Sequence, residues 1–146
     1  MYVKRVGNDI IILVIYVDDI IIRGSEASAI TLIKSNMSKV FDMTDLGLLH
    51  YCLGVEVWQT GSNIFVSQAK YARSLLDKFK MIDCKTSSIP MEKGLKLLAK
   101  SDSNTVNESV YRQLVGSLIY LTTTTPNLSF VMSFISKFMS SPKVEH

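Results

Sequence analysis

The chain has 146 residues, of which 47% are hydrophobic and 20% charged, with seven glycines and three prolines. These values exclude a disordered, low-complexity or fibrous protein and fit about one globular domain. The formal net charge is only +3, but in residues 70–100 Lys and Arg outnumber acidic residues by eight to three. Such a local basic excess suits contact with a polyanion, and the alternative is a solvated helix face followed by a loop.

The N-terminus lacks the long apolar core of a signal peptide, and the most apolar run, residues 10–22, contains Asp18 and Asp19. A membrane span needs about 20 apolar residues without such charges. We therefore expect an intracellular protein that is neither secreted nor in a membrane, in a compartment that the sequence does not specify. Cys52 and Cys84 are too few for a disulfide framework and are expected to be free thiols.

The first part of the chain is predicted to be rich in strands. A short strand covers residues 2–5, and the β-branched run at 10–17 predicts a strand buried on both faces. Asp18 and Asp19 interrupt this run before residues 20–22 resume it, which is typical of a hairpin whose turn lies at the acids.

Helical spacing of apolar residues follows this hairpin and predicts a helix over residues 26–41, with Ser25 as its N-cap. Residues 48–60 predict two short strands with a kink at Gly54, and residues 64–66 predict the return strand of a second hairpin. Ser67 is then expected to cap a helix over residues 68–80.

The last part of the chain is predicted to be helical. Residues 82–109 contain Pro90, Gly94 and many polar residues, and are expected to form a long, irregular, basic connection. Helices are predicted over residues 110–121 and 127–139, with a break at Pro126 between them, because the residue before a proline disfavours helix. Asn127 is the expected cap of the last helix.

Asp18 and Asp19 are the sharpest chemical feature. Two carboxylates at the tip of an apolar hairpin bind hard divalent cations such as Mg²⁺, which take oxygen ligands and complete their shell with water and substrate phosphates. The alternative is a solvent-exposed turn that happens to contain two acids.

The residues around the acids form an ordered series that resembles the copia-type reverse transcriptase of LTR retrotransposons, an RNA-directed DNA polymerase. The resemblance extends over nearly the whole chain. Its motifs are Val3-Lys4-Arg5, Tyr16-Val17-Asp18-Asp19, Phe41-Asp42-Met43, Asp45-Leu46-Gly47, Leu53-Gly54-Val55-Glu56-Val57, Ser67-Gln68, Lys70-Tyr71, Asp83-Cys84-Lys85, Pro90-Met91, Tyr111-Arg112, Leu114-Val115-Gly116-Ser117-Leu118, Tyr120-Leu121 and Phe138-Met139-Ser140.

The resemblance implies an α+β fold: a partial polymerase palm of antiparallel hairpins and helices, followed by a helical thumb or connection segment. The palm would cover residues 1–81, with the catalytic hairpin and the first helix after a hairpin that grips the primer. Residues 82–109 would be the irregular basic linker and residues 110–146 the thumb or connection segment.

The resemblance also implies template-directed DNA synthesis with two Mg²⁺ (or Mn²⁺) ions, an RNA template, a DNA primer and deoxynucleotides. Asp18 and Asp19 would be the catalytic metal ligands, with Asp19 the weaker one. Tyr16, Val17, Leu53, Gly54 and Glu56 would support the active site and the primer. The expected nucleic-acid-binding residues are Lys70, Arg73, Lys78, Lys80 and Lys85. Tyr51 and Trp58 could stack on bases or sugars, and a structural role is an equal alternative.

The family pattern also includes a third carboxylate and nucleotide-binding fingers upstream, and an RNase H module downstream. The chain is expected to lack these parts and therefore to be incomplete for catalysis alone. Thr125-Pro126-Asn127 stands where the family usually has Arg-Pro-Asp. The alternatives are a non-enzymatic nucleic-acid-binding domain and a degenerate domain derived from a retroelement.

Overall fold

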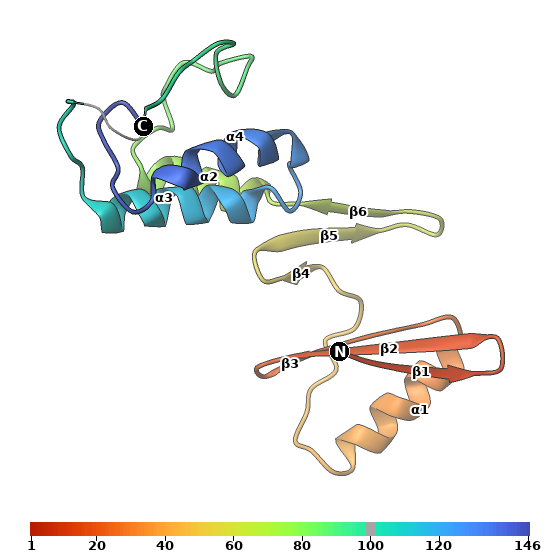
Figure 1. Ribbon diagram of the computed structural model, residues 1–146. Coiled ribbons are helices and arrows are strands. Elements are labelled where there is room, and N and C mark those ends of the chain that lie inside the picture. The colour runs from red at the N-terminus through yellow and green to blue at the C-terminus, as the bar shows by residue number, and fades with distance from the viewer. Residues whose placement is uncertain (99–101) are drawn as a thin grey trace. The chain divides into compact units, whose positions relative to one another are not determined.

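The computed structural model describes residues 1–98 and 102–146 and gives a mixed α/β chain (Figure 1). The described residues form two three-stranded antiparallel sheets and four α-helices, which agrees with the α and β content predicted from the sequence. They divide into two compact units, Met1–Leu49 (unit 1) and His50–His146 (unit 2). The predicted division into palm, linker and thumb remains a prediction, because it concerns the parts of a larger polymerase.

Unit 1 is a three-stranded sheet with one helix. Strands β1 (Tyr2–Val6), β2 (Asp9–Tyr16) and β3 (Asp19–Gly24) pair in sequence order, and helix α1 (Ala27–Ser38) follows β3. A Cβ at Gly24 would lie 3.3 Å from the Ile30 side chain. The helix therefore lies close to the end of β3, and a larger residue at position 24 would require its neighbours to shift by a few tenths of an ångström.

The prediction that β2 is buried on both faces is wrong. In this strand only Ile11 is buried, and Ile15 and Tyr16 are about half exposed. β2 is the central strand of its sheet, with β1 and β3 on its two sides. Within unit 1, however, a single helix cannot cover both faces of a sheet.

The predicted N-cap of α1 is also wrong. The cap is Glu26, whose Oε1 accepts a hydrogen bond from Ser28 N. Ser25 Oγ instead accepts from Ile10 N and donates to Asp9 Oδ1, so it joins the start of β2 to the end of β3. The helix ends at Ser38, a few residues earlier than predicted.

Unit 2 begins with a smaller sheet. Its strands are β4 (Tyr51–Cys52), β5 (Val55–Gln59) and β6 (Ile64–Ser67), again paired in sequence order. The turns between them fall at Leu53-Gly54, where the sequence predicted a kink at Gly54, and at residues 60–63, one residue more than the predicted connection at 61–63. Helix α2 (Ala69–Lys78) follows almost directly, and Ser67 Oγ accepts from Ala69 N at its start.

Helix α3 (Glu108–Leu121), helix α4 (Ser129–Ile135) and the segment after α4 form the core cluster of unit 2. Tyr111, Val115 and Phe138 form its buried cluster, and Val115 is only 1% exposed. Asn107 caps α3 through its side chain, which accepts from Val110 N. The break before α4 lies where Pro126 predicted it.

The predicted cap at Asn127 is wrong. Asn127 lies inside a 3-10 helix, η1 (Pro126–Leu128), that leads into α4. A second 3-10 helix, η2 (Ser136–Phe138), replaces the last turn of the predicted long helix. Before α3, the described parts of the predicted linker form no regular element until an isolated bridge joins Thr105 to Lys143. Residues 99–101, including Lys100 of the basic run, lie outside the described residues.

Candidate nucleic-acid and metal-binding site

The hairpin tip between β2 and β3 carries the two acids. The strands pair up to Tyr16 and Asp19, so the turn consists of Val17 and Asp18. The predicted turn at Asp18-Asp19 is therefore wrong by one residue. The difference matters, because Asp18 lies in the turn while Asp19 is the first residue of β3, opposite Tyr16.

Val17, the first residue of this turn, adopts an unusual backbone conformation. Its φ is +51°, in the left-handed region, and its side chain is 80% exposed. A β-branched residue seldom adopts this conformation, which costs on the order of 1–3 kcal/mol. Strain of this kind is often found at functional sites, and here it determines the direction of the backbone that carries Asp18.

Both carboxylates are exposed and supply only oxygen ligands. This donor set fits Mg²⁺, which is commonly held by one or two carboxylates and keeps its other positions for water and phosphate. No group of three or more His, Cys, Asp or Glu side chains that could hold a metal occurs in residues 1–98 and 102–146. Asp18 and Asp19 thus supply only some of the ligands that a bound metal ion would need.

The Leu53-Gly54 turn in unit 2 is the second site predicted from the sequence. Both residues have positive φ, +50° and +80°, which is the conformation of a tight two-residue hairpin turn. The Tyr120 hydroxyl, from α3, donates a hydrogen bond to the Leu53 carbonyl. A Cβ at Gly54 would meet the Tyr120 ring at 3.6 Å, so the turn lies directly against that ring.

Tyr71 of α2 supports the same contact. Its ring packs edge-on against Tyr120, with 5.1 Å between the centroids, and its hydroxyl donates to the Ser117 carbonyl at 3.2 Å. The turn is therefore fixed to two helices by aromatic side chains. Its position relative to the helices does not depend on the strand ladder alone.

Glu56 connects strand β5 to the start of α2. It is buried, its Oε2 accepts from Lys70 N at 3.2 Å, and its Oε1 lies 3.3 Å from Lys70 Nζ. A carboxylate at the first turn of a helix is stabilised by the free N–H groups and by the helix dipole. Since the N-cap residue, Gln68, makes no side-chain capping bond, Glu56 supplies this interaction from another element.

Sequence reasoning gave no role to Gln68, which is only 2% exposed. Its Nε2 donates to the Tyr120 carbonyl at 3.4 Å, and its Oε1 accepts from Thr124 Oγ1 at 2.9 Å. Gln68 and Tyr120 are 52 residues apart in the chain. The only signal in the sequence was the Ser67-Gln68 motif of the resemblance, which does not reveal the partners.

The predicted nucleic-acid-binding residues lie on α2 and just after it. Lys70, Arg73 and Lys78 belong to the helix and all are exposed, although Lys70 also pairs with Glu56. Lys80 follows the helix with φ +57°, and Lys85 lies in the irregular segment beyond. The structure therefore presents these cations to solvent along one continuous stretch of chain.

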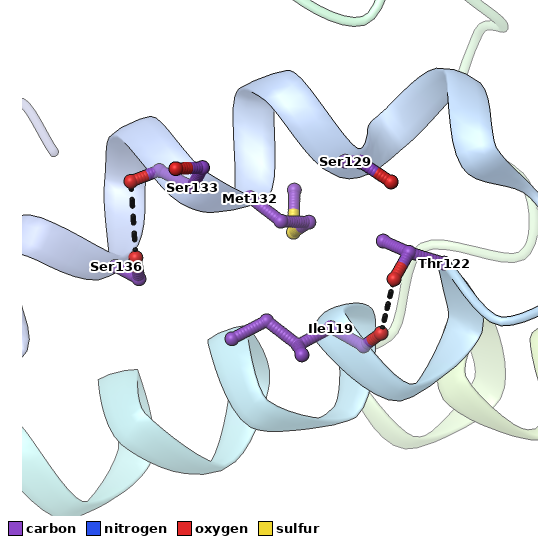
Figure 2. Close-up of a pocket in the computed structure, with 6 residues that line it drawn as sticks. All are labelled: Ile119, Thr122, Ser129, Met132, Ser133 and Ser136. Carbon is purple, nitrogen blue, oxygen red and sulfur yellow. Dashed lines mark hydrogen bonds between the residues drawn. The ribbon is translucent and has the colours of Figure 1, made fainter.

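The surface pocket between α3 and α4 offers no comparable chemistry (Figure 2). It is lined by apolar and hydroxyl side chains. Thr122 Oγ1 donates to the Ile119 carbonyl and Ser136 Oγ donates to the Ser133 carbonyl, so these hydroxyls complete their own helices. Among the described helices, none has the length and apolar character required to cross a membrane.

Residues 1–93 match the family described as reverse transcriptase (RNA-dependent DNA polymerase), and the chain belongs to this family. The match includes the hairpin with Asp18 and Asp19, the Leu53-Gly54 turn and helix α2. No solved structure matches the chain.

The relatives confirm the resemblance to copia-type retrotransposons. Over its whole length the chain is 34% identical to the retrovirus-related Pol polyprotein of transposon RE1 from Arabidopsis thaliana, and spans 10% of that protein. It is 36% identical to the corresponding polyprotein of transposon TNT 1-94 from Nicotiana tabacum, and spans 12% of it. An uncharacterized mitochondrial protein of Arabidopsis thaliana is 37% identical over 131 residues, covering 89% of this chain and 54% of that protein.

Proposed function

We propose that the chain is a part of a retrotransposon reverse transcriptase that contributes metal-binding carboxylates and primer contacts to RNA-directed DNA synthesis. Because the chain spans about a tenth of the polyproteins that it matches, the remaining catalytic parts would come from the rest of such a protein. In this assignment residues 1–81 are palm, residues 82–109 a basic linker, and residues 110–146 the thumb or connection segment.

Asp18 and Asp19 are the residues that would hold Mg²⁺ or Mn²⁺. When bound, such ions lower the pKa of the primer 3′-hydroxyl and neutralise charge on the leaving pyrophosphate. Asp18, in the turn, is the principal ligand. Asp19, the first residue of β3, is the weaker one, as the resemblance to the family implies.

Tyr16 and Val17 position these carboxylates. Tyr16 is the last residue of β2 and packs beneath the primer end in this proposal, while the left-handed conformation of Val17 sets the direction of the turn. A turn that is already strained into one conformation needs little reorganisation when substrate binds, which favours catalysis.

Leu53, Gly54 and Glu56 support the primer strand. The Leu53-Gly54 turn offers its backbone at a position fixed by Tyr120, and Glu56 fixes the strand that follows to α2. The cations on and after α2 then contact phosphates, where they replace condensed counterions and give affinity that does not depend on base sequence.

The observation that carries the proposal is the pair of exposed carboxylates on a strained hairpin tip in a chain of the reverse transcriptase family. The test is primer extension on an RNA template with Mg²⁺ or Mn²⁺. It compares the chain alone with a chimera in which the chain replaces the matching segment of the RE1 polyprotein. We expect synthesis from the chimera only.

In the chimera, Asp18→Asn should reduce the rate of synthesis by at least about 100-fold, because the principal metal ligand is lost. Asp42→Asn, at another exposed acid of unit 1, is the matched control and should change it little. Full activity of the Asp18→Asn chimera would contradict the catalytic role. Synthesis by the isolated chain would contradict its role as one part of an enzyme.

The second candidate is a nucleic-acid-binding domain without synthesis, kept by a degenerate retroelement. It is favoured by unit 2, which has its own buried core and presents the exposed cations of α2. This candidate predicts binding to a primer–template with a steep salt dependence, while the chimera remains inactive.

A further inference from the structure

Three aromatic side chains lie on one face of the sheet in unit 2. Trp58 of β5 is directly opposite Phe65 of β6, and Tyr51 of β4 is directly opposite Glu56. Directly opposed residues share a face, and so do residues two apart in one strand. Tyr51, Trp58 and Phe65 therefore form one aromatic face, with Tyr51 about 7 Å along the strand direction from the Trp58–Phe65 pair.

These rings are exposed to solvent, while buried side chains fix the strands that carry them. Their residues are 58%, 50% and 56% exposed for Tyr51, Trp58 and Phe65, respectively. Val57 is buried on the opposite face of β5. Glu56, which shares the face of the rings, is buried as well and binds the start of α2, so both side chains fix the strand. The aromatic face thus presents large rings in fixed positions, which lowers the entropy lost when a flat ligand stacks on them.

The charges next to the aromatic face favour a polyanion as its occupant. The Lys70 ammonium lies 3.3 Å from Glu56 Oε1, hence beside this face, and is largely exposed. Helix α2 begins two residues after β6 ends, so its other cations, Arg73 and Lys78, follow the aromatic strand directly. A partner protein bound only through apolar contacts would not use such cations.

We propose that the aromatic face binds single-stranded nucleic acid, with bases stacked on Trp58, Phe65 and Tyr51 and a phosphate near Lys70. Aromatic rings beside a basic track are the combination that single-strand-binding proteins use, and stacking tolerates any base because each one has a π-face. The inference rests on the nucleic-acid contact of the proposed function and adds a site of base contact to it.

The test uses Trp58, the single tryptophan of the chain, as the probe. A 12-nucleotide oligo(dT) or oligo(U) is titrated into the full chain, and the tryptophan fluorescence and the anisotropy of a labelled oligonucleotide are recorded together. Stacking on the indole should quench its fluorescence in parallel with binding. Tyr51→Ala and Phe65→Ala should each weaken binding by about tenfold, the size typical of removing one stacked base.

Phe130→Ala is the matched control, since Phe130 is an aromatic residue of α4 that is 72% exposed. It should leave both quenching and affinity unchanged. Circular dichroism of each variant shows whether the fold is kept, and Tyr51→Phe and Phe65→Tyr, which keep a ring, should restore binding if stacking is the cause.

Two results would overturn the inference while leaving the proposed function intact. One is oligonucleotide binding without quenching and without sensitivity to Tyr51→Ala or Phe65→Ala, which would mean contact through the cations alone. The other is a blue shift of Trp58 emission that depends on protein concentration and not on oligonucleotide, which would mean that a second copy of the chain covers the aromatic face. Absence of any binding at low salt would overturn both the inference and the nucleic-acid contact.

Discussion

The two units hold their candidate functional residues by different means. In unit 1, Asp18 and Asp19 are carried by a strand ladder, and Ile11 is the one buried hydrophobic residue among those that the structure describes there. In unit 2, the Leu53-Gly54 turn is held by side chains of two helices, above a core centred on Val115. The hairpin with Asp18 and Asp19 is thus held mainly by backbone pairing, whereas the Leu53-Gly54 turn is also held by side chains of α2 and α3.

This contrast explains where strain and burial occur. Unit 1 leaves Tyr2, Val17, Leu32 and Leu46 largely exposed and tolerates the positive φ of Val17. Unit 2 buries the polar side chains of Glu56 and Gln68, each with hydrogen-bond partners from other elements. A buried polar group with its partners costs little, but losing one partner costs about 1–3 kcal/mol. Substitutions in unit 2 should therefore perturb the structure at positions farther away in the sequence.

The largest expected effect comes from placing a charge in the core of unit 2. Val115→Asp should lower the free energy of unfolding of unit 2 by more than about 4 kcal/mol, because the carboxylate has no partner there. Urea unfolding followed by Trp58 fluorescence measures this unit directly. Val110→Asp, at an exposed position of α3 in the same unit, is the control and should change this stability by less than about 0.5 kcal/mol. Equal effects of the two substitutions would mean that burial of Val115 does not stabilise unit 2.

Glu56→Gln tests whether the segment after the Leu53-Gly54 turn depends on side chains. The amide keeps an acceptor for Lys70 N–H but loses the charge that pairs with Lys70 and with the helix N-terminus. We expect a loss of about 1 kcal/mol and faster hydrogen exchange of the amides in residues 55–57. Glu108→Gln, which breaks the exposed pair with Arg112, should cost about 0.5 kcal/mol or less. Unchanged exchange in residues 55–57 would show that the strand ladder alone holds this segment.

Val17→Asn tests the strain at the hairpin that carries Asp18 and Asp19. Asn adopts the left-handed conformation far more easily than valine, so the variant should stabilise unit 1 by about 1 kcal/mol. Native-state hydrogen exchange of the β2–β3 amides measures the change. Val3→Asn, at an exposed position of β1, should give no such gain. Destabilisation by Val17→Asn would mean that the turn is not strained.

The smallest expected effect is a loss of stability of unit 2 at alkaline pH. Burial raises the pKa of the Tyr111 hydroxyl above its ordinary value of 10.0, so the fold favours the protonated form. Stability from this group is therefore complete below about pH 10 and is lost as the pH rises through the higher pKa of the folded state. Tyr111→Phe should reduce the loss of stability between pH 9 and pH 11, measured by urea unfolding. An identical alkaline loss in the variant would assign it to other groups.

Local patterns in the sequence predicted most elements of both units. The strands around Gly7 and Gly54, the helices over residues 69–78 and 108–121, and the break at Pro126 depend on nearest-neighbour preferences that act within a few residues. The errors described next occur where a contact between residues distant in sequence determines the local structure. Ser25 bonds to Asp9 and Ile10 and leaves the helix cap to Glu26, and the ladder continues to Tyr16 and Asp19, which moves the turn by one residue.

The candidate site likewise has features that local sequence patterns predicted and features that depend on contacts between distant residues. The sequence predicted its residue types and their order along the chain, from the two acids to the cations of α2. These types could be recognised because metal binding requires carboxylates and phosphate binding requires cations. Gln68 and Tyr120 were not assigned, because their partners are far away in sequence and no local preference encodes such a bond.

The sequence by itself determined the family, the apolar hairpin with its two acids, and the basic character of the stretch after β6. Only the tertiary structure decided that Val17 takes the strained position, that Glu56 is the buried partner of α2, and that Tyr51, Trp58 and Phe65 share one exposed face. The physical reason is that composition and local spacing fix what each segment can form. Burial and strand register, which depend on the pairing of distant segments, fix which side chains meet.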